Sequence, residues 1–379
     1  MMRLILLFFM LFSGITYSQE SADPQEFFLS VSPAVDQNNE NNRLILRSLS
    51  IFLRDFNRNQ WLNQDFETFK GPYADLFQIS PGKNGEFSYQ PSVMEIIQTE
   101  KPQERLVKIA FIGTNDPQNK NNLVKAIYNV IAVRTLNGIR FKNAMPYFTK
   151  NWLKAGKGSV YYYYPPGKVL NQKEMSRQHT ENMQLAQFFE THPIQINYYS
   201  ARNPVELFNI KGFDYHPMMF VDSSGGFAVD YNIVLSANNS EYYQHEVAHL
   251  YTAKLFPDIA SLLDEGFATY VGGSGKFDYF WQREKLHRFL SDNPDFDIGR
   301  HLDPYERIYF EEETPVPYLI GALLCERILR VHGKQKMMDL MKSGLSLAEI
   351  LPEVGLNLNN INTELRREIQ RDVHDVFKN

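Results

Sequence analysis

Two histidines one helical turn apart limit what this chain can fold into more than any other feature of its sequence. His245 and His249 bracket Glu246 in the segment His-Glu-Val-Ala-His. In an α-helix, positions i and i+4 lie on one face, so both imidazoles can reach a single ion. Glu246 then lies beside that ion as a base and not as a ligand. Taken alone, the five-residue pattern also fits a pair of hydrogen-bonded histidines with a structural role.

The sequence around this pattern predicts where the helix begins and ends. Asn238-Asn239-Ser240 offers side chains that cap helix N-termini, and Pro257 should end the helix at Phe256. Apolar residues on a neighbouring face are expected to bury the helix against a core: Tyr243, Val247 and Leu250.

A second segment offers a third ligand. Leu262 to Tyr270 begins thirteen residues after His249, and Pro257-Asp258 turns the chain between them. Two helices joined by a short turn face each other, so Glu265 can point towards the histidine pair. A hydrolytic zinc site needs three protein ligands and one open position, which this arrangement satisfies. Taken by itself, Glu265 fits an exposed helical carboxylate better.

Two neighbours of Glu265 also carry predictions. Glycine inside a helix costs about 1 kcal/mol, so Gly266 indicates that another helix must approach closely at this point. Thr269 lies one turn after Glu265 and is a candidate to hydrogen-bond a ligand imidazole from behind the metal site.

Together the two segments resemble the gluzincins, the superfamily of zinc peptidases that includes thermolysin and aminopeptidase N. The run Leu263-Asp-Glu-Gly-Phe-Ala-Thr-Tyr270 is especially similar to the aminopeptidase-N branch, whose third ligand stands in a Glu-Gly-Phe-Ala context. The resemblance implies that His245, His249 and Glu265 bind one zinc ion and that Glu246 is the general base.

The resemblance covers about residues 155 to 345, with a somewhat shorter gap between the two motifs than that branch shows. Tyr318-Leu-Ile-Gly321 resembles the family's Tyr-x-x-Gly helix, in which the Tyr hydroxyl stabilises the oxyanion; a packing role in an ordinary amphipathic helix is the alternative. Gluzincins also pair substrate backbone with an upstream edge strand. The corresponding place here is held by Gly225, Gly226, Phe227 and Asp230.

Aminopeptidases carry a Gly-x-Met-Glu-Asn motif on that strand, with a Glu that grips the free amine. The motif is absent here, and Asp230 is at most a partial substitute, so strict aminopeptidase specificity is not supported. The resemblance otherwise implies zinc-dependent hydrolysis of peptide bonds. A zinc-bound water would lose its proton to Glu246 as it attacks, while zinc and Tyr318 share the oxyanion charge. Two alternatives stay open: a non-catalytic zinc scaffold of the cell envelope, and a hydrolase of non-peptide amides.

The chain as a whole predicts an α+β protein with two main parts. Residues 25–152 form a small α+β domain that is loosely similar to the nuclear-transport-factor-like folds, and 155–345 form the gluzincin domain with a mixed sheet and a mainly helical C-terminal part. Residues 346–379 are predicted as a helical extension. In the first part we expect a helix over Arg43–Arg58 and a hairpin turn at Asn137-Gly138. Three strands are also expected: Leu106–Ile112, Ala126–Thr135 and Ile139–Phe148.

The second part is expected to begin with a junction at Trp152–Gly158. Helices are predicted over Lys173–Glu190 and from Asn203-Pro204 through Phe208. Short apolar and aromatic runs predict four strands: Ser159–Tyr164, Ile194–Tyr199, Met218–Val221 and Phe227–Leu235.

Charge and cysteine content exclude several classes of function. Lys and Arg total 39 against 44 Asp and Glu, a net charge of −5, so no basic excess is present to bind nucleic acid. The single cysteine, Cys325, excludes an internal disulfide and a cysteine-based zinc site. The partner we expect is therefore a peptide or protein substrate; the oligomeric state is left open.

The first eighteen residues have the order of a cleaved export signal. Arg3 precedes the apolar run Leu4–Phe12, and small residues follow. The run is shorter than the roughly 20 residues that span a bilayer, so no stable membrane insertion is expected after cleavage. These features predict an exported bacterial protein, periplasmic or secreted.

Overall fold

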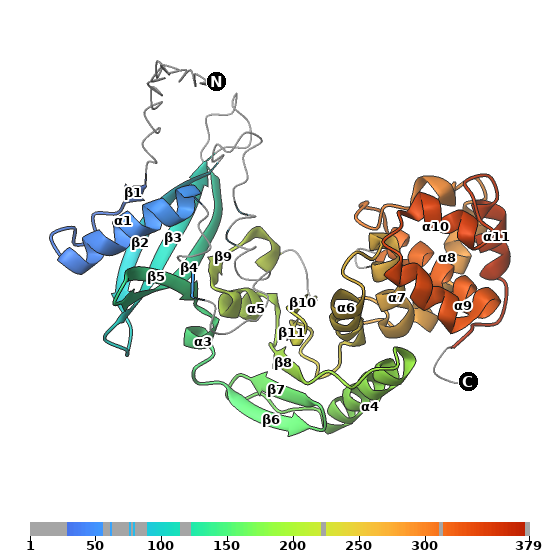
Figure 1. Ribbon diagram of the computed structural model, residues 1–379, viewed down its shortest axis with the longest axis horizontal. Helices are drawn as coiled ribbons and strands as arrows, with labels where there is room; N and C mark the ends of the chain where they lie inside the picture. The colour runs from blue at the N-terminus through green and yellow to red at the C-terminus, as the bar shows by residue number, and fades with distance from the viewer. Residues whose placement is uncertain are drawn as a thin grey trace, which may run out of the picture.

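The computed structural model describes residues 29–55, 61–62, 76, 79, 89–113, 123–220, 225–310 and 314–375. The predicted export signal lies outside these residues. The described part is a mixed α+β structure with two mixed sheets and a group of helices at the C-terminal end (Figure 1). None of the described helices combines the length and apolar character needed to cross a membrane.

The first sheet carries helix α1 on one face. Its strands follow the order β1 (Ser30–Val31), β2 (Tyr89–Gln98), β3 (Glu104–Gly113), β4 (Leu123–Thr135) and β5 (Gly138–Asn143). β1 runs parallel to β2 and the other neighbours are antiparallel. Helix α1 (Glu40–Asp55) begins three residues before its predicted start and buries Leu49 and Phe52 in the core beneath it.

A segment from the second half of the chain completes this sheet. Strand β9 (Phe213–Tyr215) pairs with β4, and Asn129 donates from both its backbone and its side chain to the Gly212 carbonyl, at 2.7 and 3.0 Å. Phe208, on helix α5 (Pro204–Lys211), lies in the same core. Residues of the predicted second domain thus complete the core of the first.

The second sheet supports the helix with the two histidines. Its order is β10 (Gly226–Val229), β11 (Ile233–Ser236), β8 (Ile196–Ser200), β7 (Val160–Tyr164) and β6 (Leu153–Lys157). The three inner strands are parallel and the two edge strands antiparallel. Helices α4 (Gln172–Phe188) and α6 (Gln244–Leu255) contact it, and Tyr162 and Tyr198 are buried in the shared core.

Five helices form the C-terminal part: α7 (Ser261–Gly272), α8 (Tyr279–Asp292), α9 (Val316–Lys342), α10 (Leu347–Glu353) and α11 (Ile361–Glu368). A two-stranded hairpin, β12 (Tyr309–Phe310) and β13 (Thr314–Pro315), precedes α9. Ile350, Ile361 and Leu365 are buried in the same core as α6 and α7. The region predicted as an extension is therefore an integral part of this core.

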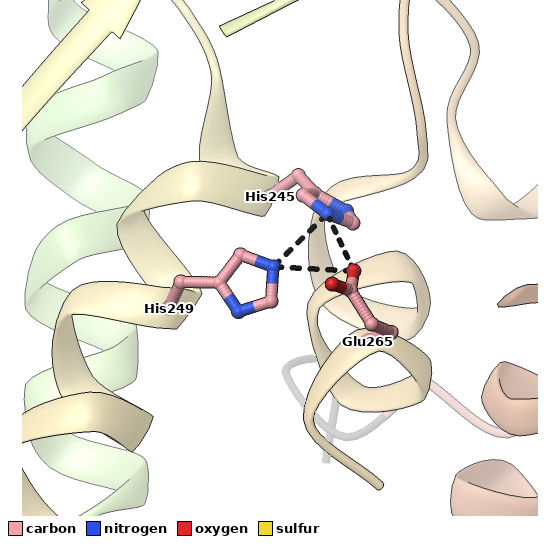
Figure 2. Close-up of side chains that lie close together, drawn as sticks. All are labelled: His245, His249 and Glu265. Carbon is pink, nitrogen blue, oxygen red and sulfur yellow. Dashed lines mark hydrogen bonds and ion pairs between the residues drawn. The ribbon is translucent and has the colours of Figure 1, made fainter. Parts of the chain in front are cut away.

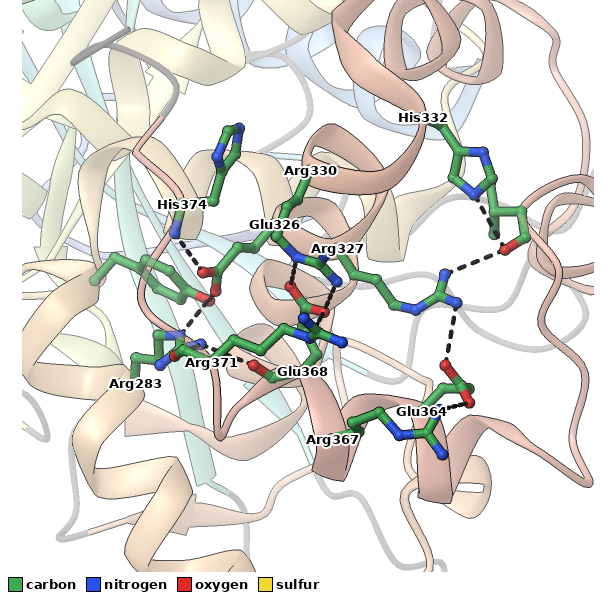
Figure 3. Close-up of polar contacts among 12 residues, drawn as sticks. Arg283, Glu326, Arg327, Arg330, His332, Glu364, Arg367, Glu368, Arg371 and His374 are labelled. Carbon is green, nitrogen blue, oxygen red and sulfur yellow. Dashed lines mark hydrogen bonds and ion pairs between the residues drawn. The ribbon is translucent and has the colours of Figure 1, made fainter.

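A buried polar network fastens the chain end to these helices (Figure 3). Arg283 Nε lies 2.8 Å from Glu326 Oε2, with side chains 4% and 0% exposed. Glu326 also accepts from the His374 backbone N–H at 2.8 Å, and Arg283 donates to the carbonyls of Glu368 and Arg371, each at 3.1 Å. Buried charges are tolerated only when they are paired and hydrogen-bonded, so this network joins α8, α9 and the chain after α11.

Two predicted strands are wrong in part. The expected strand Ile139–Phe148 ends at Asn143 and continues as the short helix α3 (Met145–Phe148), because the Asn143 side chain accepts from the Met145 N–H at 2.7 Å and Pro146 starts a helical turn. The expected strand Met218–Val221 is instead the 3₁₀ turn η2 (Pro217–Met219) over its described residues, capped by His216.

Two other predictions differ in their boundaries. The junction expected at Trp152–Gly158 contains strand β6, which pairs with β7 through the turn at Gly158. The single strand expected over Phe227–Leu235 is a hairpin, β10 and β11, whose turn holds Asp230 at a φ of 53°. Splitting this strand leaves β10 at the edge of the sheet, with β11 as its one strand partner among the described residues.

Candidate metal centre

Helix α6 presents the histidine pair, but it begins later than predicted. Its first residue is Gln244, and the predicted capping residues lie outside it. The Ser240 hydroxyl and the Glu241 N–H instead donate to Glu174 Oε2 of α4, at 2.7 and 2.8 Å. These contacts hold the loop before α6 against α4. The end of the helix at Leu255, with Phe256 as its C-cap, agrees with the prediction.

Helices α7 and α9 meet at two glycines next to the site. A Cβ added to Gly266 would lie 2.4 Å from the Gly321 carbonyl carbon, and one added to Gly321 would lie 2.8 Å from the Leu262 carbonyl oxygen. Side chains cannot occupy such positions, so only glycine permits this approach. The close helix contact predicted at Gly266 is confirmed, and it brings Tyr318 of α9 to the same region as Glu265.

The three predicted ligands converge (Figure 2). His245 Nε2 lies 3.1 Å from His249 Nε2, and Glu265 Oε2 lies 3.5 and 3.4 Å from these two nitrogens. Zinc bonds of about 2.0–2.1 Å in a tetrahedral site place neighbouring ligand atoms about 3.3–3.4 Å apart. The three atoms therefore have the spacing of one face of such a tetrahedron.

Hydrogen bonds behind the rings orient both imidazoles. His245 Nδ1 lies 2.7 Å from the Gly273 carbonyl oxygen, and His249 Nδ1 lies 3.1 Å from Asp264 Oδ1. Because both partners only accept, each Nδ1 carries a proton, and each ring, when it is neutral, turns an Nε2 lone pair towards the other ligands. Glu265 Oε2 is buried and has no hydrogen-bond partner among the described residues. Three electron pairs facing one point fit a cation.

The prediction for Thr269 is wrong. Its hydroxyl is buried without a hydrogen-bond partner in the described part of the chain, and Asp264 and the Gly273 carbonyl orient the imidazoles in its place. Asp264 is in turn held by the Thr252 hydroxyl at 2.6 Å. The sequence did contain a signal for Asp264, since an acidic residue next to a predicted ligand is a natural partner for a ligand histidine.

The charges of the cluster also favour a cation. Burial lowers the pKa of His249, but the carboxylates of Asp264 and Glu265 outweigh it and raise that pKa well above its usual value. Burial raises the pKa of Glu265, but contacts with His245 and His249 outweigh it and leave that pKa far below its usual range. Without a metal ion, the cluster therefore binds a proton, which supplies a positive charge among its carboxylates.

Glu246, on the same helix as the histidine pair, contacts β10, the edge strand of the second sheet. The Ala228 N–H donates to Glu246 Oε2 at 2.7 Å, which fixes the carboxylate, and the side chain is buried. A Cβ on Gly226 would lie 2.5 Å from the Tyr243 ring, so β10 approaches α6 this closely only because of that glycine. Gly226 and Phe227 lie on the edge strand as predicted; Gly225 directly precedes it, and Asp230 lies in the turn after it.

Tyr318 stands over the first ligand. Its ring lies parallel to the His245 imidazole, with 6.1 Å between ring centres and an angle of 11°. Burial, and then the negative charge of Glu265, raise the pKa of Tyr318 above its usual value. The phenol therefore stays protonated at neutral pH and remains a hydrogen-bond donor.

Compared with known proteins, the chain matches no protein-family model, no curated protein and no solved structure. The geometry itself supports one plain statement. Over the residues that the structure describes, His245, His249 and Glu265 are the one group of three or more His, Cys, Asp or Glu side chains that is placed to hold a metal ion.

Proposed function

We propose that this centre binds one zinc ion and hydrolyses peptide bonds. The observation that carries the proposal is the convergence of two Nε2 atoms and one carboxylate oxygen, which has no hydrogen-bond partner among the described residues, at tetrahedral spacing. Two imidazoles and one carboxylate, with no thiolate, are the ligand set of a hydrolytic zinc site with a position left for water.

A zinc ion held by His245, His249 and Glu265 would supply a Lewis acid and would lower the pKa of a water molecule to about 7. The protein supplies the remaining groups. Glu246, held by the Ala228 N–H, takes the proton from the attacking water and delivers it to the departing amine. Tyr318, protonated at neutral pH, donates to the oxygen on which negative charge develops. Asp264 and the Gly273 carbonyl keep the imidazoles in their ligand orientation.

The free edge of β10 supports a peptide as the substrate. Ala228 faces away from β11 and donates its N–H to Glu246, so the alternation of an antiparallel ladder leaves the backbone groups of Gly226 on the same outer edge. An extended peptide can pair with such an edge through main-chain hydrogen bonds. Its scissile carbonyl would then lie beside Glu246.

A non-catalytic zinc scaffold is the less favoured function. A structural zinc site is closed by four protein ligands and has no use for a base, whereas here three ligands converge and a carboxylate is fixed next to them. We also propose that the protein works outside the cytoplasm, on the basis of the export-type segment at residues 1–18.

The test is cleavage of casein and of a mixed peptide library by the zinc-loaded chain. Glu246→Gln should keep its zinc and lose on the order of 100-fold or more in rate, since the ligands remain and the base is gone. Glu284→Gln, the same change at an exposed position of α8, is the matched control and should be fully active. Undiminished cleavage by Glu246→Gln would exclude the mechanism, and a zinc-loaded chain that cleaves no peptide would exclude the function.

A further inference from the structure

A cavity of about 440 Å³ lies beside β10. It is walled by β4, α5 and the 3₁₀ turn η2, by Gly225, and by Gly226 and Phe227 at the start of β10. In Figure 1, β10 lies between α5 and α6, so one short strand borders both the cavity and the candidate metal centre. The first sheet, which the metal centre does not use, thus contributes a wall to a space next to it.

The alternation of side chains along β10 connects the two spaces. Gly226 faces Tyr243 at the start of α6, because a Cβ there would meet that ring. Phe227 therefore faces the opposite side, where its ring contacts Phe208 of α5 at 6.1 Å between centres. A peptide paired with the edge of β10 has the same alternation. Its residues point in turn towards the metal centre and towards the cavity.

The walls of the cavity are largely apolar, with two lysines among them. Phe208, Phe213 and Phe227 line it, together with Lys125 and Lys211. Lys211 Nζ lies 3.9 Å from the centre of the Phe227 ring. A space of this size accepts a large side chain, and its aromatic walls favour an apolar one. The Lys125 ammonium opposes the entry of another cation.

His216 shows how these charges act inside the cavity. Its ring stacks on Phe208 at 4.8 Å, and its Nδ1 accepts from the Met218 N–H at 3.2 Å. Burial, with the positive charges of Lys211 and Lys125, lowers the pKa of His216 to about 4. The imidazole is therefore neutral at pH 7, and the cavity disfavours added positive charge.

We propose that this cavity is a specificity pocket for an extended peptide lying along β10, which accepts a bulky apolar or aromatic side chain and rejects Lys and Arg. The proposal rests on the proposed function, because the peptide that fills the pocket is the one presented to the metal centre. The pocket, built partly from the first sheet, assigns that part of the chain a role in choosing the substrate.

Peptide binding tests the pocket without any cleavage. Two fluorescein-labelled nonapeptides, identical Ala/Ser/Gly sequences with a central Phe or a central Lys, are titrated into the metal-free full chain and followed by anisotropy. The Phe peptide should bind at least about tenfold more tightly than the Lys peptide, the effect of burying one aromatic side chain. Equal affinities, or no binding of the Phe peptide, would overturn the proposal.

Three variants make the test specific. Phe227→Ala should lower the affinity for the Phe peptide by about tenfold. Lys125→Glu should bring the affinity for the Lys peptide to within about threefold of that for the Phe peptide, because it reverses the charge of that side chain. Lys157→Glu, the same charge change on an exposed residue of β6, should leave both affinities unchanged. If Phe227→Ala and Lys125→Glu, with unchanged thermal unfolding, behave like Lys157→Glu, the pocket is not the binding site.

The two proposals fail separately. If the zinc-loaded chain cleaves peptides but the Phe and Lys peptides bind equally well, the specificity pocket is excluded and the peptidase activity is supported. If the Phe peptide binds more tightly but the zinc-loaded chain cleaves no peptide, the peptidase activity is excluded and a peptide-binding pocket is supported.

Discussion

Replacing Gly266 by alanine tests whether the contact between α7 and α9 builds the metal centre. The new Cβ would lie 2.4 Å from the carbonyl carbon of Gly321, 2.6 Å from its oxygen and 2.8 Å from its Cα. These are backbone atoms of a helix, so no side chain can rotate away. To reach ordinary contact distances, the two helices must separate by about 1 Å, moving Glu265 relative to Tyr318.

Two opposing effects set the size of the change. Alanine is better than glycine inside a helix by about 1 kcal/mol, whereas overpacking a close contact costs about 1–3 kcal/mol. The upper end applies here because the contact is backbone against backbone, so the free energy of unfolding should fall by about 1–2 kcal/mol. Zinc affinity should fall as well, because the same contact places Glu265 opposite the histidine pair.

Urea unfolding and a competition titration with a zinc chelator measure both effects. Gly156→Ala is the matched control, since its Cβ would have the Tyr161 side chain as its nearest neighbour, at 3.5 Å, and the φ there is ordinary. A Gly266→Ala protein as stable as the wild type would refute the packing argument. A destabilised protein with unchanged zinc affinity would refute the link between this contact and the site.

The other predictions concern the orientation of the ligands and the attachment of the chain end. Asp264→Asn should weaken zinc binding by about 10–100-fold in a chelator titration, because His249 loses the carboxylate that orients it; Thr269→Val should leave zinc affinity unchanged, and a loss there would restore Thr269 as a hydrogen-bonding partner. Glu326→Gln should lower the free energy of unfolding in urea by about 3–5 kcal/mol, because it leaves Arg283 buried without its countercharge. Glu353→Gln, which breaks the exposed pair with Lys336, should change the free energy of unfolding little. Similar losses of stability in the two variants would contradict the role of burial.

Local patterns in the sequence predicted much of the fold. Helical periodicity found α1 and α4 because one face of each is apolar, and Asn137-Gly138 correctly predicted the turn between β4 and β5, which pair as far as Thr135 with Gly138. Pro257 marked the end of α6 because the residue before a proline avoids helical geometry. Each of these signals acts over a few neighbouring residues.

Elements determined by distant contacts were missed. Strand β9 has three residues, too few for periodicity, and exists through its pairing with β4, which begins ninety residues before it in the sequence. Ser240 has the chemistry of a helix cap, yet its hydroxyl donates to Glu174 of α4, so a tertiary contact outweighs the local preference. The junction expected at residues 152–158 forms a strand because β7 offers it a partner.

The sequence predicted the metal ligands better than it predicted the groups that hydrogen-bond those ligands. Spacing alone places His245 and His249 on one face of a helix, and a short turn brings Glu265 opposite them. The choice of Asp264 over Thr269 depends on the offset between α6 and α7, which spacing does not determine. The Gly273 carbonyl carries no side-chain signal, and only the folded chain places it against His245.

Zinc content per chain tests the central claim most directly. Elemental analysis of the purified, dialysed protein should give about one zinc per chain, and His249→Ala and Glu265→Ala should each reduce it to a small fraction under the same conditions. Wild-type protein that retains no zinc after incubation with the metal, or a His249→Ala variant that keeps a full equivalent, would contradict the convergence of these three side chains on one ion.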